Sequence, residues 1–300
     1  MGYFLVSTSM VFGCSLLISS LIALFQLQSF SFTTARDDLS AVQASHVVAV
    51  PRIGGVAVVS ALTLGILLWF GRDPTQPNFI MFLATMIPIF IVGLSEDLGF
   101  SASPRARLLA AAVSGTLYVF LFNIWLPRTD VPGLDMLMTS APFAITFSLF
   151  MAVGVSHAFN LIDGLNGLAA LTSIFAALAL AAIANAHQLD GHRDALLLLS
   201  IAIAGFLVLN FPFGRIFLGD AGAYVIGHVL VWTSISILWH VPSVTPLAIL
   251  LIFFWPIADT LLAIVRRLAS GAPIAMPDRL HFHQMVMRAV EILFLGRDKR

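Results

Sequence analysis

The chain has 300 residues, of which 59% are hydrophobic and 10% are charged, and its formal net charge is zero. A soluble domain carries about 25% charged residues. This composition, with a mean hydropathy of +0.99, excludes an ordinary soluble domain and predicts a polytopic integral membrane protein. The zero net charge identifies no partner, and no nucleic-acid partner is expected.

Nine apolar runs are candidates for membrane spans, since a span needs about 20 residues. They lie near residues 3–26, 53–70, 78–94, 108–126, 142–158, 168–186, 195–210, 221–239 and 246–265. We interpret them as helices, because a lipid-exposed backbone must satisfy its own hydrogen bonds. The predicted fold class is all-α, a polytopic transmembrane helical bundle of about nine to ten spans. Residues 1–300 form a single integral membrane domain in this interpretation, with residues 289–300 as a short surface tail.

The 15 lysine and arginine residues divide unequally between two sets of loops. One set holds Arg36, Arg52, Arg105, Arg107, Arg215, Arg266, Arg267, Arg279, Arg288, Arg297, Lys299 and Arg300. The other set holds only Arg72, Arg128 and Arg193. The positive-inside rule places the richer set in the cytoplasm. We therefore expect a multi-pass protein of the inner (plasma) membrane with its N-terminus outside.

Five short polar segments fall on the predicted cytoplasmic side and hold the acids and histidines best placed for chemistry. They lie within residues 37–55, 95–98, 160–167, 217–222 and 277–283. A carboxylate at a membrane surface is tolerable only where water, a metal or a cationic partner meets it. Five such segments on one face predict an active site there.

The segment 160–167 carries Asn160, Asp163 and Asn166 at intervals of three residues. Asp-Gly and Asn-Gly pairs are turn dipeptides, so a simple helix-ending turn is one interpretation. An interrupted helix at membrane depth is otherwise found where it lines a cavity. The second interpretation is a site in which these three side chains bind a metal or a nucleotide.

The segment 217–222 opens a predicted helix with Phe217, Gly219, Asp220 and Gly222. Asp220 is either the N-cap of that helix or a hard oxygen ligand suited to Mg²⁺. In the functional interpretation the two glycines let a phosphate or nucleotide approach the backbone closely. Phe217 either stacks on a base or packs in the core.

Glu96 and Asp97 are adjacent carboxylates at the end of a predicted span. They repel one another unless cations lie nearby, and Arg105 and Arg107 follow in the same loop. The alternative is a solvated loop without function.

The remaining two segments contain cationic groups. In the last one Arg279, His281 and His283 lie close together without a cysteine, which favours phosphate binding over a zinc site. In the segment 51–55 the glycines permit close helix packing and Arg52 obeys the positive-inside rule.

Taken in order, these segments resemble the signatures of the polyprenyl-phosphate N-acetylhexosamine-1-phosphate transferases, the WecA/MraY superfamily. The matching positions are Asp38, His46, Pro51-Arg52-x-Gly54-Gly55, Glu96-Asp97, Asn160-x-x-Asp163-Gly164-x-Asn166-Gly167, Phe217-x-Gly219-Asp220 and Pro277-Asp278-Arg279-x-His281-Phe282-His283. The resemblance runs from about residue 38 to 288, and its last loop is nearer to the WecA branch.

The resemblance implies transfer of an N-acetylhexosamine 1-phosphate from a UDP-sugar to polyprenyl (undecaprenyl) phosphate, with release of UMP. This would be the initiating step of a cell-envelope glycan. The implied cofactor is Mg²⁺, with Mn²⁺ as an alternative. The implied partners are the UDP-N-acetylhexosamine, the polyprenyl phosphate lipid and the membrane, and a homodimer is left open.

The resemblance also assigns roles at the reacting centre. Asp220 would be the main metal ligand and Asn160 a second one. Asp97 and Glu96 would handle the lipid-phosphate nucleophile, although Glu96 stands where the family has aspartate.

Other side chains would hold the substrates. Phe217 would stack on uracil, with Asp163 and Asn166 near the nucleoside. Arg52 and His46, from the first signature, join the substrate-binding set.

The last loop would hold the pyrophosphate through His281, His283 and Arg279. Gln284 ends a stretch that in the family often carries a third histidine. Relatives usually continue with one or two further helices, so the final family helices are expected to be missing here.

A membrane transporter or flippase for a lipid-linked or nucleotide sugar is the alternative function. It would require ionisable groups near the bilayer midplane and paired inverted repeats. The sequence contains no visible repeat, and the carboxylate well inside a span, Asp259, is close to one end of it.

Overall fold

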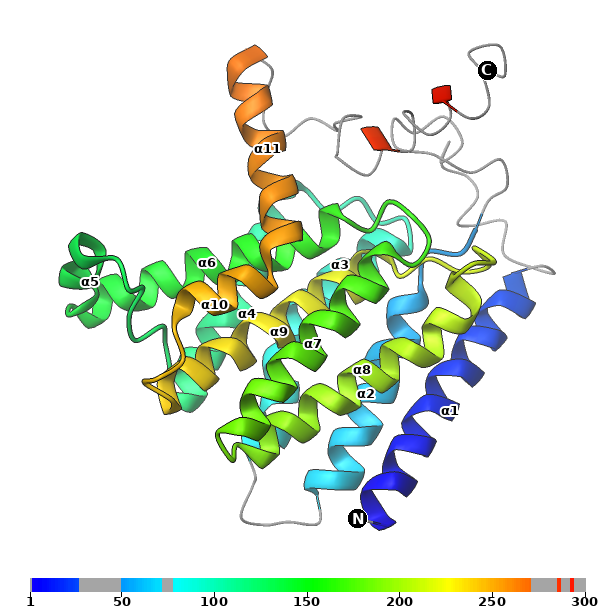
Figure 1. Cartoon of the computed structure of the whole chain (residues 1–300). Coiled ribbons are helices and arrows are strands. Elements are labelled where there is room, and N and C mark those ends of the chain that lie inside the picture. The colour runs from blue at the N-terminus through cyan, green and yellow to red at the C-terminus, as the bar shows by residue number, and fades with distance from the viewer. Residues whose placement is uncertain (1, 27–49, 72–77, 271–284, 287–291, 294–300) are drawn as a thin grey trace.

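The computed structural model describes residues 2–26, 50–71, 78–270, 285–286 and 292–293. Eleven helices make up the described fold (Figure 1). Their bounds are α1 Gly2–Gln26, α2 Gly54–Phe70, α3 Asn78–Asp97, α4 Pro104–Phe122, α5 Pro132–Met138, α6 Ala141–Leu161, α7 Leu168–Ala186, α8 Asp190–Asn210, α9 Gly219–His240, α10 Pro246–Ile252 and α11 Phe254–Ser270. The all-helical, multi-pass class predicted from composition is confirmed for this part of the chain.

Seven of the described helices are long and apolar enough to cross a membrane, or eight if α10 and α11 count as one bent span. The prediction of nine to ten spans is not confirmed. α2 is apolar but has only 17 residues. The run predicted as one span over 246–265 folds as two helices bent by 79°.

The bend between α10 and α11 has a local cause. Pro256 lacks an N–H group, and its ring conflicts with the carbonyl four residues earlier. That carbonyl belongs to Ile252, where α10 ends. In Figure 1, α11 extends away from the other helices.

α9 is the central helix, and its span is entirely buried. It packs against α2, α3, α4, α6, α7 and α8. A helix that is apolar on all sides is stable only when other helices surround it, and Trp232 of α9 is completely inaccessible. Both ends of α9 therefore lie where several surrounding helices begin or end.

Glycines allow the first turn of α9 to pack closely on α2 and α3. A side-chain carbon at Gly93 of α3 would lie only 2.6 Å from the Cα of Ala221, and one at Gly55 of α2 would overlap the backbone of Gly222. The backbone N–H groups of Gly54 and Gly55 donate to the carbonyls of residues 217 and 218 at 2.9 and 2.6 Å. The interpretation of the 54–55 glycines as packing residues is confirmed.

Candidate functional site

Four of the five polar segments meet at one end of the bundle, around the first turn of α9. They are the start of α2, the end of α3, the segment that follows α6, and the start of α9 itself. The fifth segment, with Arg279, His281 and His283, lies outside the described residues, as does His46. The predicted gathering of distant segments is therefore confirmed for the part of the chain that the structure describes.

Asp97, the last residue of α3, caps the N-terminus of α9. Its Oδ1 accepts the backbone N–H of Asp220 at 2.8 Å, and its Oδ2 accepts that of Ala221 at 2.9 Å. The first N–H groups of a helix lack partners within the helix and carry the positive end of its dipole, so a carboxylate is well placed there. The interpretation of Asp220 as the N-cap of its own helix is wrong, because Asp97 supplies the cap from another helix.

Asp163, in the turn after α6, binds the same helix end. Its Oδ2 accepts the backbone N–H of Gly219 at 3.2 Å. Burial raises the pKa of Asp163 to about 6, and nearby Asp220 adds to the rise, while Arg52 and the Gly219 N–H group oppose it. Two carboxylates thus hold three successive N–H groups of α9.

Asp220 has partners on both carboxylate oxygens. Its Oδ1 accepts a hydrogen bond from Asn160 Nδ2 at 3.0 Å, and its Oδ2 lies 3.3 Å from a guanidinium nitrogen of Arg107. The carboxylate is nearly buried, with 11% of its side chain exposed, against 26% for Arg107. Arg107 was expected to relieve the repulsion between Glu96 and Asp97. It forms an ion pair with Asp220, and the charge of Glu96 also acts on it.

Gly219 and Gly222 do not leave the backbone open to a ligand. Gly219 has a φ of +75°, and a side-chain carbon there would overlap the carbonyl of Arg52. At Gly222 such a carbon would lie 2.7 Å from the Cα of Gly55. The space beside both glycines is taken by the chain itself, so the interpretation that they admit a phosphate is wrong.

The remaining predicted residues in the described ranges surround this centre. Glu96 accepts the backbone N–H of Ala102 at 2.7 Å. Arg52 is exposed. The backbone N–H of Phe217 donates to the carbonyl of Pro51 at 2.7 Å, so these two segments are joined by their backbones.

Asn166 lies in the turn before α7, beside the turn that follows α8. Its Oδ1 is buried and has no hydrogen-bond partner among the described residues. The next backbone N–H, of Gly167, donates to Asn210 Oδ1 at 2.7 Å, which joins the two turns. A buried acceptor without a partner is costly, so Asn166 is suited to binding a ligand or a water molecule.

His157 and Tyr224 belong to this centre but were not predicted from the sequence. His157 Nδ1 lies 2.9 Å from the carbonyl of Val153. It therefore donates there, and Nε2 is left as a buried acceptor without a partner in the described ranges. The His157 ring lies 4.9 Å from the ring of Tyr224. One sequence signal was available, because His157 precedes Asn160 by three residues and so shares its helix face.

The residues at this centre fit a magnesium ion. Mg²⁺ is usually bound by one or two carboxylates, with water and substrate phosphates completing its oxygen ligands. Asp220 supplies a carboxylate and Asn160 an amide 3.0 Å away. Within the described ranges no three acidic, histidine or cysteine side chains are grouped to hold a metal.

Comparison with known proteins places these residues in a family. The model of glycosyl transferase family 4 matches residues 79–238. A Bacillus subtilis protein named a probable undecaprenyl-phosphate N-acetylglucosaminyl 1-phosphate transferase is 30% identical over 244 residues, covering 79% of this chain and 65% of its own length. A Mycobacterium tuberculosis protein named decaprenyl-phosphate N-acetylglucosaminephosphotransferase is 27% identical over 273 residues, covering 81% of this chain and 67% of its own.

An Escherichia coli O157:H7 protein named undecaprenyl-phosphate alpha-N-acetylglucosaminyl 1-phosphate transferase is 28% identical over 249 residues and is covered over 66% of its length. The chain thus spans about two thirds of the length of these curated relatives. The matched region contains Asp97, Asn160 and Asp220, which meet at the start of α9. The resemblance seen in the motifs is confirmed, and the chain belongs to glycosyl transferase family 4.

Proposed function

We propose that the protein transfers an N-acetylhexosamine 1-phosphate from a UDP-sugar to a polyprenyl phosphate such as undecaprenyl phosphate. The observation that carries this proposal is the meeting of Asp97, Asp163 and Asp220 with Asn160 and Arg107 at one end of a membrane bundle. The relatives are named for N-acetylglucosamine, so UDP-N-acetylglucosamine is the first donor to test. The product would begin a cell-envelope glycan.

The reaction needs no strong base. The second pKa of a phosphate monoester is about 6, so the lipid phosphate is largely dianionic near neutral pH. One of its oxygens attacks the sugar-bearing phosphorus of the UDP-sugar. A new P–O bond forms, the bond from that phosphorus to the oxygen shared with the other phosphate breaks, and UMP leaves with the electron pair.

The main task of the protein is to bring two anions together and hold them in line, as in other phosphoryl transfers. Arg107 would contribute a positive charge beside Asp220, where its guanidinium already lies. Asp97 would be a positioning residue, because both of its carboxylate oxygens already accept N–H groups from the first turn of α9. Glu96 stays a prediction as an acid at the acceptor phosphate.

The proposed metal is Mg²⁺, with Mn²⁺ as the alternative, held by Asp220 and Asn160. When bound, it would neutralise charge on the diphosphate and on the departing UMP. Phe217, Asp163, Asn166, Arg52 and His46 are proposed to bind the substrate, and Arg279, His281 and His283 the pyrophosphate.

In the proposed topology this end of the bundle faces the cytoplasm, and the N-terminus of the protein lies outside. One observation supports it, because the charge distribution obeys the positive-inside rule in this orientation. The proposed donor, a soluble nucleotide sugar, would then reach the site from the cytoplasm. The lipid acceptor explains why an enzyme for a soluble nucleotide is built from membrane helices.

The test is release of UMP by the purified protein in lipid nanodiscs, using undecaprenyl phosphate and a panel of UDP-sugars. We expect release that needs both substrates, stops on chelation of divalent ions and returns with Mg²⁺. Asp220→Asn should abolish it, whereas Asp190→Asn, at an exposed position on α8, should not.

Two results would contradict the proposal. One is full turnover by Asp220→Asn, which would show that Asp220 is not a metal ligand. The other is exchange of labelled substrate across sealed vesicles without chemical conversion, which would support the transporter instead.

A further inference from the structure

A cavity of about 340 Å³ lies between α3, α4, α8 and α9, away from the site described above. Ser236 and His240 of its wall lie in the last turns of α9, whereas Asp220 lies in the first turn. The rise of a helix, about 1.5 Å per residue, separates Asp220 from Ser236 by about 24 Å. A small ligand in this cavity therefore cannot contact the candidate active site.

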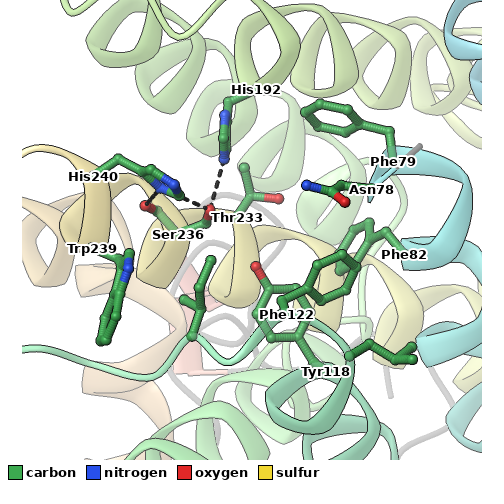
Figure 2. A pocket seen from close by; sticks show the side chains of 12 residues that line it. Asn78, Phe79, Phe82, Tyr118, Phe122, His192, Thr233, Ser236, Trp239 and His240 are labelled. Carbon is green, nitrogen blue, oxygen red and sulfur yellow. Dashed lines mark hydrogen bonds between the residues drawn. The ribbon is translucent and has the colours of Figure 1, made fainter. Parts of the chain in front are cut away.

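Two histidines of the cavity contact Ser236 (Figure 2). The Ser236 hydroxyl lies 2.7 Å from His192 Nε2 and 3.5 Å from His240 Nδ1, which lies closer, at 2.7 Å, to the Ser236 carbonyl. Thr233 and Asn78 also line the cavity, and their polar ends are drawn facing it. The wall thus offers hydroxyl, amide and imidazole groups, all of which can both donate and accept hydrogen bonds.

Aromatic rings form much of the remaining wall. Phe82 and Tyr118 are buried, with 7% and 5% exposure, and their rings lie 5.6 Å apart. Phe79, Phe122 and Trp239 complete this set. Residues of an aromatic belt at the membrane interface would face lipid, but these side chains face a common cavity together with five polar ones.

Within the described residues the cavity wall contains no Asp, Glu, Lys or Arg. A ligand with a phosphate or carboxylate would lose its hydration there without gaining an opposite charge. A purely apolar chain would leave the hydroxyl, amide and imidazole groups of the wall without new partners. The wall is matched to an uncharged molecule that has both a ring-sized apolar face and several hydroxyl groups.

We propose that this cavity binds a neutral pyranose sugar, as a second site independent of the proposed transferase activity. The electron-rich faces of aromatic rings suit the C–H groups of a sugar ring, while Ser236, His192 and Asn78 suit its hydroxyls. The volume is within the range of small-molecule pockets, about 300–1,000 Å³. Asn78 begins α3 and His240 ends α9, so the site lies at an end of the bundle, where a free sugar or the sugar head of a lipid can reach it.

The test is sugar binding to the whole protein in nanodiscs prepared without glycoside detergents, which would occupy the site. The probes are methyl glucoside and N-acetylglucosamine as free sugars, octyl glucoside as a lipid-linked sugar, and glucose 6-phosphate as a charged one. Tryptophan fluorescence provides the readout, since Trp239 lines the cavity. We expect saturable binding of a neutral probe, with glucose 6-phosphate binding at least about tenfold more weakly.

Two variants locate the binding. His192→Phe keeps the ring and removes its hydrogen bonds, and Ser236→Ala removes the central hydroxyl. Each should weaken binding by about tenfold, whereas His187→Phe, at an exposed position, should not change it. Thermal melting in the same nanodiscs excludes unfolding, and loss of the signal in Trp239→Phe assigns the signal to the cavity.

The outcomes separate clearly. Binding of the free sugars supports a soluble ligand, and binding of octyl glucoside alone supports a lipid headgroup. No saturable binding of any neutral probe would overturn the proposal. Equal binding of glucose 6-phosphate, or unchanged binding by folded His192→Phe and Ser236→Ala, would overturn it as well.

Discussion

Asp97 accepts the backbone N–H of Asp220 at 2.8 Å, so two carboxylates that are 123 residues apart in the chain are held side by side at the start of α9. Asp220 directs its own carboxylate to Asn160 and Arg107. One acid therefore organises the backbone of the helix, while the other is presented toward the centre. Because the two acids have different roles, substitutions at this centre should affect stability and activity in different ways.

Asp97→Asn should lower stability as well as activity. The amide has one acceptor oxygen instead of two and places an N–H₂ group against a backbone N–H. We expect a loss of about 1–3 kcal/mol in the free energy of unfolding, the range for lost caps and for charged hydrogen bonds. Thermal or denaturant unfolding in detergent measures it. Glu96→Gln is the matched control, because glutamine can still accept the N–H of Ala102, and equal stability of the two variants would argue against the capping role.

Asn160→Ala should weaken binding of Mg²⁺. The variant removes a proposed ligand and the hydrogen bond that orients Asp220. Groups that orient metal ligands commonly contribute about 10–100-fold to affinity, so the Mg²⁺ concentration for half-maximal UMP release should rise by at least about tenfold. Asn185→Ala, whose side chain binds Arg193 near the start of α8, serves as the control. An unchanged Mg²⁺ titration would exclude Asn160 from the metal site.

His157→Phe should reduce kcat/KM for the UDP-sugar. The buried Nε2 acceptor is unsatisfied in the described structure, and we expect a substrate hydroxyl or a bound water to satisfy it during the reaction. Loss of such a hydrogen bond costs about 1–3 kcal/mol, which corresponds to roughly 5–150-fold in rate. His157→Gln, which keeps an acceptor, should recover part of the activity, and wild-type kinetics in His157→Phe would show that Nε2 has no partner in the reaction.

Asp163 should make stability depend on pH. Its pKa is about 6 when folded and about 3.9 in an unfolded chain, so the folded state binds the proton more tightly. The stabilising effect of the protonated form is complete below about pH 4 and is lost as the pH rises through about 6. Across this pH range the free energy of unfolding should change by at most about 3 kcal/mol. The measurement is thermal melting of the wild type and of Asp163→Asn between these pH values, with divalent ions chelated. The stability of the wild type relative to Asp163→Asn should fall as the pH rises. A relative stability that does not change with pH would contradict this prediction.

Gly55→Ala should destabilise the contact between α2 and α9. The added methyl group would overlap the backbone of Gly222, which cannot move aside as a side chain can. Overpacking typically costs about 1–3 kcal/mol, and we expect the upper end of that range. Gly154→Ala in α6 is the matched control, since nothing lies within 4 Å of the added carbon, and it should gain up to about 1 kcal/mol in helix propensity. Similar melting temperatures for both variants would refute the close contact.

The sequence by itself determined the class of the protein and its family. Hydropathy predicts membrane helices because burial in lipid acts on each segment separately. The ordered motifs around Asp97, Asn160 and Asp220 were visible because they are short and local. The same local patterns also identified Gly54 and Gly55 as packing residues.

Only the tertiary structure decided what several of those residues do. Local patterns suggested that Asp220 caps its own helix and that Gly219 and Gly222 receive a phosphate, but Asp97 supplies the cap and the chain itself fills the space beside both glycines. The cavity around Ser236 was equally hidden. The physical reason is that these features depend on contacts between different helices and turns, and such contacts are set by how the helices pack.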